Sequence, residues 1–112
     1  MAAKNESLTI EWTLTAERQL FQVLHYWIDK TGSTVFARKL SNAVWERAMQ
    51  LSKDPYSAVQ TTFPDTRKVA MGHYSMFYKV MRLKIVITAF WDNRKDPEKL
   101  YSLLSLKTKP RS

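Results

Sequence analysis

The sequence predicts an α+β domain in which an N-terminal helical hairpin covers one face of a small antiparallel sheet, in the order β-α-α-β-β-β-α. Apolar residues recur at three- and four-residue spacing through the first half of the chain, whereas β-branched and aromatic residues dominate after residue 66. The 112 residues suit one domain built around one core. We therefore expect a single domain over residues 1–112, with frayed ends at 1–6 and 107–112.

The first predicted elements are a strand and a helix. Residues 8–12 alternate apolar and polar side chains, which is typical of a short, half-buried strand. In the helix that follows, Thr13 or Thr15 can cap the N-terminus and Gly32 can cap the C-terminus. One apolar stripe runs along this helix and consists of Ala16, Leu20, Val23, Leu24, Trp27 and Ile28.

A second helix follows after a short turn. Ser33 is its predicted N-cap, and Asp54-Pro55 ends it. Because the turn is so short, the two amphipathic helices should pack antiparallel. Residues 54–66 then form an irregular connection that contains two prolines.

Three strands are predicted at 68–71, 76–81 and 84–91, and their close spacing indicates an antiparallel meander. The last run is apolar on both faces, which predicts a central strand covered on both sides. Regular alternation places Ile85, Ile87, Ala89 and Trp91 on one side and Val86, Thr88 and Phe90 on the other.

The chain ends with a predicted short helix and a basic tail. Asp96-Pro97 is a favoured helix start, because a capping residue is followed by proline at the first helical position. The apolar anchors of this helix are Leu100, Leu103 and Leu104. Since the helical hairpin occupies one face of the sheet, we expect the second face to be a concave, basic surface.

The charge distribution is one-sided. The formal net charge is +8, and the whole excess lies in residues 66–112, because acidic and basic side chains are equal in number over residues 1–65. Such a field suits a polyanion, whose phosphate contacts release counterions. It also suits an acidic protein partner, or serves solubility alone.

Composition excludes several kinds of site. The chain has no Cys and two His, which rules out disulfides and thiol catalysis and leaves a conventional metal site poorly supplied. We expect no metal and no cofactor. The N-terminal residues lack the apolar run of a signal peptide, and the longest apolar stretch is too short to span a bilayer. We therefore expect a cytoplasmic protein with no membrane contact.

Three segments carry a resemblance to a known family. They are Trp12-Thr13 with Ala16 and Leu20, the strand from His73 to Val80, and the run from Ile85 to Trp91 that continues through Asp92-Asn93-Arg94 to Leu100. In this order and spacing the chain resembles the RelE/ParE family of bacterial toxins over nearly its whole length. The family's element order agrees with the one predicted above.

The resemblance implies the toxin of a type II toxin–antitoxin pair, which a cognate antitoxin protein neutralises. RelE-like members are ribosome-dependent endoribonucleases that cut mRNA without metal, and this is the function we expect first. ParE-like members inhibit DNA gyrase without catalysis, and this is the alternative. The fold cannot decide between them. A third possibility is a nucleic-acid-binding module, although the sequence has no recognition-helix signature.

Cleavage of RNA without metal needs cations that hold the phosphorane charge and groups that transfer protons. The resemblance implies that the catalytic set consists of Lys68, Arg94, Lys95 and Tyr101. The side chains expected to bind nucleic acid are Arg67, Lys79, Arg82 and Trp91.

One position departs from the family pattern. Ser75 stands where the family has an arginine after the first tyrosine of the strand, and a serine cannot supply a cation. Arg67, Lys79 or Arg82 are the candidates for replacing it. The alternative interpretation of these basic residues is a solvated sheet face or edge, and for Trp91 it is the edge of the core.

Overall fold

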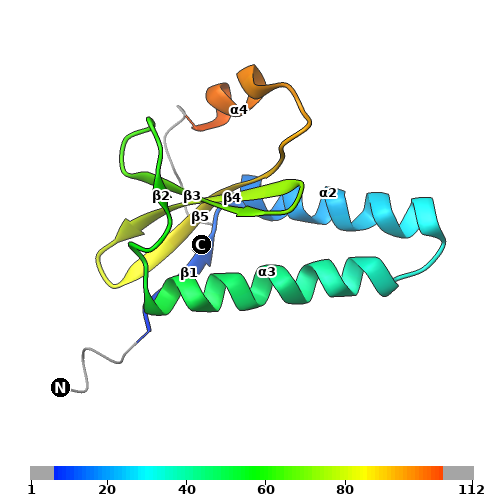
Figure 1. Cartoon of the computed structure of the whole chain (residues 1–112), viewed down its shortest axis with the longest axis horizontal. Helices are drawn as coiled ribbons and strands as arrows, with labels where there is room; N and C mark the ends of the chain where they lie inside the picture. Colours follow the sequence, from blue (N-terminus) through cyan, green and yellow to red (C-terminus); the bar gives the residue numbers. More distant parts are fainter. Residues whose placement is uncertain (1–6, 105–112) are drawn as a thin grey trace.

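The computed structural model describes residues 7–104, which form a five-stranded sheet with two long helices on one face and a short helix on the other (Figure 1). The elements in chain order are β1 (Thr9–Trp12), α2 (Leu14–Thr31), α3 (Val35–Lys53), β2 (Val59–Gln60), β3 (Thr66–Met71), β4 (Tyr74–Met81), β5 (Lys84–Asp92) and α4 (Pro97–Leu104). The predicted frayed ends, 1–6 and 107–112, lie outside the described residues.

The predicted α+β architecture is confirmed, with two additions. The strand order is β1-β5-β4-β3-β2, and β1 pairs with β5 in parallel, so the sheet is mixed and not purely antiparallel. The connection over 54–66 also contributes β2, a two-residue edge strand that pairs with β3. Neither feature has a local sequence signal, because both depend on pairing with distant residues.

The helix caps follow the local sequence. The Thr13 hydroxyl accepts a hydrogen bond from the Ala16 N–H at 3.1 Å, which satisfies one of the unpaired donors of the first turn. Gly32 takes the left-handed conformation, with φ 69°, and donates its N–H to the Ile28 carbonyl. The predicted cap of α3 is wrong by one residue, since Thr34 is the N-cap while the Ser33 hydroxyl accepts the Val35 N–H.

A β-bulge in β5 overturns the predicted alternation of that strand. Tyr78 pairs with Ile87 and Phe77 pairs with Ala89, so Thr88 is an extra residue. Beyond Thr88 the side chains change faces, and Phe90 joins Ile87 in the core beneath the helices, whereas Ala89 lies on the opposite face. The prediction failed because strict alternation assumes an unbroken register.

Hydrogen bonds to neighbouring elements stabilise the bulge. The Phe90 N–H donates to Gln19 Oε1 on α2 at 2.9 Å, and the Thr13 N–H donates to the Ile87 carbonyl at 3.0 Å. The Thr88 hydroxyl donates to the Phe77 carbonyl at 3.4 Å. The start of α2 is thereby fixed to β5, an inner strand of the sheet.

The second face of the sheet is partly covered, which corrects the expectation of an open surface. Leu100 and Leu104 of α4 pack there against Phe77, Ala89 and Trp91. Figure 1 shows α4 across the sheet from α3. Both faces of β5 are therefore buried, as its apolar sequence predicts. Among residues 7–104, no helix is both long enough and apolar enough to cross a membrane.

Candidate functional site

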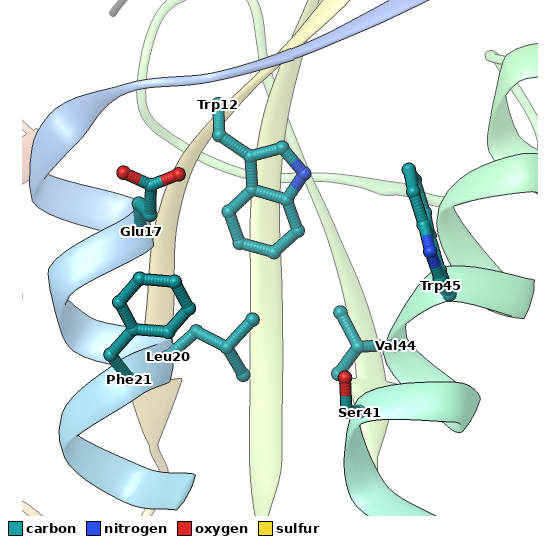
Figure 2. Close-up of a pocket in the computed structure, with 7 residues that line it drawn as sticks. All are labelled: Trp12, Glu17, Leu20, Phe21, Ser41, Val44 and Trp45. Carbon is teal, nitrogen blue, oxygen red and sulfur yellow. The ribbon is translucent and has the colours of Figure 1, made fainter. Parts of the chain in front are cut away.

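An apolar groove opens between α2 and α3. Leu20, Val44 and Trp12 line its inner part, and the rings of Phe21 and Trp45 stand on its two sides (Figure 2). The cavity measures about 250 Å³. It stays open because α3 contributes the small side chains of Ser41 and Val44 at this level and its tryptophan faces outward.

The groove belongs to a larger exposed apolar area. Trp45 is 58% exposed and Phe21 is 50% exposed, which is unusual for such large side chains. Leu14 and Met49, on the same two helices, are also exposed. Contiguous apolar surface of this kind marks a protein partner site more often than a catalytic centre. Glu17 is the only charged residue in the lining.

A second cavity, of about 440 Å³, lies at the C-terminal end of β5 against α2 and is here called the Arg94 pocket. Its lining consists of Gln22, Val23, Tyr26, Tyr74, Asp92, Arg94 and Lys95. Arg94 donates from Nε and from Nη2 to the two carboxylate oxygens of Asp92, at 2.9 and 2.8 Å. These hydrogen bonds are the main reason why the pKa of Asp92 is lowered and that of Arg94 is raised.

The fold is similar to that of a solved structure from a toxin–antitoxin system. A chain from the chromosomal ParDE TA system of P. aeruginosa matches with a TM-score of 0.66, over 75% of this chain and 94% of that chain. The fold is ParE-like. The two sequences are 17% identical, so the likeness establishes the fold and not the activity. No protein-family model matches the sequence, and neither does any curated protein.

This ParE-like fold divides the predicted catalytic set between the two sides of the sheet. Arg94 and Lys95 line the pocket against α2. Lys68 lies opposite Phe77 in the register, which puts it on the face that α4 covers. Tyr101 is on α4, where its half-exposed ring packs on Phe63 with centroids 5.4 Å apart.

The predicted nucleic-acid-binding residues are scattered as well. Arg67 donates to the carbonyls of Tyr56 and Ala58, so it holds the connection to β2 in place. Lys79 lies on the α4 side of β4, since it pairs with Val86 and alternates with the core residue Tyr78. Arg82 is exposed in the turn between β4 and β5.

Trp91 is 8% exposed and packs in the cluster beneath α4. Burial at this level leaves its ring no open face for stacking on a base while α4 stays in this position. Its environment therefore matches the alternative interpretation, in which Trp91 is part of the core.

Ser75 is fully buried, and its hydroxyl donates to Asn93 Oδ1 at 2.8 Å. It lies directly opposite Trp91 in the register. The position at which the family pattern has an arginine is therefore used here to fasten β4 to the segment after β5. Among the described residues, neither Lys79 nor Arg82 forms a hydrogen bond with Ser75 or Asn93.

Sequence reasoning missed the aromatic side of the Arg94 pocket. Trp27 donates its indole N–H to the Tyr74 hydroxyl at 2.8 Å, which joins α2 to β4. Tyr26, the neighbouring residue, is half exposed at the same pocket. Only the two adjacent aromatics on one helix gave a signal in the sequence, and that signal is equally typical of a core. Within residues 7–104 no three His, Cys, Asp or Glu side chains gather as a metal site would require.

Proposed function

We propose that this protein is the growth-inhibiting toxin of a type II toxin–antitoxin pair and that a cognate antitoxin neutralises it by binding the α2–α3 groove. The ParE-like fold, matched over 94% of a chain from a TA system, is the observation that carries the proposal. The exposed apolar groove supports it, because such a surface fits the apolar face of a partner helix. The excess of positive charge favours an acidic partner.

We propose further that the toxin acts in the cytoplasm by binding DNA gyrase, as ParE-like toxins do, and does not cut RNA. Two observations support this mode. The four predicted catalytic residues lie on two sides of the sheet. Ser75 supplies no cation, and its buried hydroxyl is already engaged with Asn93. A single phosphorane needs its cations and proton-transfer groups around one point.

The ribosome-dependent endoribonuclease remains the second candidate. Lys68 and Tyr101 lie on the same side of the sheet. This side therefore carries one cation and one phenol, the kinds of group that RNA cleavage without metal needs. If α4 moved away, Trp91 would gain exposure beside them. The experiments below therefore measure both the cleavage of ribosome-bound mRNA and the inhibition of gyrase.

The first experiment tests toxicity and its neutralisation. The chain is expressed from a tightly controlled promoter, alone and together with the product of the adjacent open reading frame, which the proposal expects to be a small acidic protein. We expect growth arrest with the chain alone and normal growth with the pair. Harmless high-level expression of folded protein would contradict the toxin proposal.

The groove is tested with Trp45→Ala, which removes an exposed ring and should leave the fold intact. We expect this variant to remain toxic and to lose affinity for the antitoxin by about 2 kcal/mol or more, as is typical of a buried aromatic anchor. Leu83→Ala is the matched control, because Leu83 is 73% exposed in the β4–β5 turn and does not line the groove. Equal affinities for both variants would place the antitoxin elsewhere.

The mode of action is tested by following induced cells and purified components. The gyrase proposal predicts inhibition of DNA supercoiling by the purified toxin and an early DNA-damage response, with transcripts intact. The endoribonuclease predicts discrete cuts within codons, seen by primer extension, and no effect on supercoiling. Arg94→Ala should leave the inhibition of gyrase unchanged. In an endoribonuclease, by contrast, loss of this phosphate-binding cation would slow RNA cleavage by about 10²–10³-fold.

A further inference from the structure

The Tyr74 hydroxyl is a nearly buried donor that faces the Arg94 pocket. Tyr74 is 5% exposed, and its oxygen accepts the Trp27 indole N–H. A phenol that accepts one hydrogen bond still has its own proton to donate. Among residues 7–104 no acceptor for this proton is found, and an unused donor in a buried position is unfavourable. The pocket therefore offers a donor to a molecule that carries an acceptor.

The Arg94 guanidinium is held in a fixed orientation beside this donor. Asp92 binds it through two hydrogen bonds and also accepts the Arg94 backbone N–H at 2.9 Å. The remaining N–H groups of the guanidinium point away from the carboxylate. The hydrogen bonds to Asp92 are the main reason why the pKa of Arg94 is raised. Tyr74 and Tyr26 line the same pocket as the guanidinium.

Further groups surround the mouth of the pocket. Lys95 lines it directly. Lys30 lies over the Tyr26 ring with its Nζ 5.7 Å from the centroid. Because Asp92 is the single acidic residue in the lining, against Arg94 and Lys95, the pocket has a net positive charge. The half-exposed Tyr26 ring provides a flat aromatic surface at its edge.

We propose that the Arg94 pocket binds a nucleoside phosphate, with the phosphate on Arg94, Lys95 and the Tyr74 hydroxyl and the base stacked on Tyr26. The volume of about 440 Å³ lies within the range of roughly 300–1,000 Å³ that is usual for small-molecule sites. An acidic side chain of a protein would fill only a small part of it. Cations beside an exposed aromatic ring are the combination that holds a nucleotide by its phosphate and its base.

This site is separate from the α2–α3 groove, with which it shares no lining residue. Nucleotide binding and antitoxin binding can therefore fail independently of each other. The phosphate has two possible sources, a free mononucleotide and the 5′ end of a single strand, and both present the same chemistry to the pocket.

The test is calorimetric titration of the full chain with AMP, GMP, CMP and UMP, and with a pentanucleotide with and without a 5′-phosphate. We expect saturable binding that requires the phosphate, so that adenosine binds at least tenfold more weakly than AMP. Binding of mononucleotides indicates a free ligand, whereas binding of the phosphorylated pentanucleotide alone indicates a strand end. In NMR spectra the Trp27 indole N–H should shift on binding, because its acceptor is the Tyr74 hydroxyl.

Matched variants locate the site. Arg94→Gln should weaken binding by about ten- to a hundredfold, since it removes hydrogen bonds from a charged donor. Arg82→Gln removes the same charge from the β4–β5 turn and should leave the affinity unchanged. Tyr74→Phe should weaken binding severalfold, whereas Tyr78→Phe, which removes a hydroxyl bound to the Pro55 carbonyl, should not.

Three results would overturn the proposal. The first is equal affinity for adenosine and AMP, and the second is an equal loss in Arg94→Gln and Arg82→Gln, which would mean charge attraction without a site. The third is binding of a hexaglutamate peptide that shifts the Trp27 indole signal when no nucleotide does.

Discussion

The hydrogen bond from the Phe90 N–H to Gln19 is the contact on which the bulge in β5 most depends, and its removal gives a quantitative test of the fold. Phe90 is 1% exposed, and Gln19 Oε1 is the acceptor that its N–H has among the described residues. Gln19→Ala leaves this donor unsatisfied, which costs about 1–3 kcal/mol. The gain in helix propensity from alanine offsets only a few tenths of a kcal/mol.

The expected loss is large enough to measure by thermal unfolding. For a chain of 112 residues, 1 kcal/mol corresponds to about 4 °C in Tm, so Gln19→Ala should lower Tm by about 4–12 °C. Urea titration followed by far-ultraviolet circular dichroism gives the same difference as a free energy of unfolding. Gln22→Ala is the control, because Gln22 lies one turn further along α2 and is exposed.

A conservative variant isolates the acceptor. Gln19→Glu keeps an oxygen at the same position, so it should recover more of the stability than alanine does. If Gln19→Ala and Gln22→Ala unfold at the same temperature, the bulge does not need this acceptor, and the reasoning is refuted.

Other predictions concern local backbone strain, pH and dynamics. Leu83 has φ 65°, where a side chain is strained, so Leu83→Gly should raise the free energy of unfolding by up to about 1 kcal/mol in urea titrations, and Leu83→Ala should not. Asp92 has a lowered pKa, so its stabilising effect is present above the unfolded-state value near 3.8 and is lost as the pH falls through the lower folded-state value. The difference in unfolding free energy between wild type and Asp92→Asn should therefore be constant near pH 7 and shrink below about pH 4. Amide hydrogen exchange should be faster in α4 than in α2, because α4 is held by few buried side chains, and equal protection would contradict this.

Local chemistry explains why the helices and most of the sheet were predictable. The hydroxyl of Thr13 and the left-handed conformation of Gly32 depend on residues within one helical turn, so the bounds of α2 could be predicted. The order of the last three strands followed from turn spacing, and the ParE-like fold was predicted through the order of three short segments.

The sequence by itself thus determined the elements, their order and the positive charge of the C-terminal half. Only the tertiary structure decided which side chains meet. The pairing of β4 with β5 leaves Thr88 as an extra, bulged residue. Ala89 and Phe90 therefore lie on the faces opposite to those that regular alternation predicts. The tertiary structure also pairs the Ser75 hydroxyl with Asn93 Oδ1, and it places Arg94 and Tyr101 in different pockets. The physical reason is that register and side-chain partners depend on contacts between distant residues, which no local periodicity records.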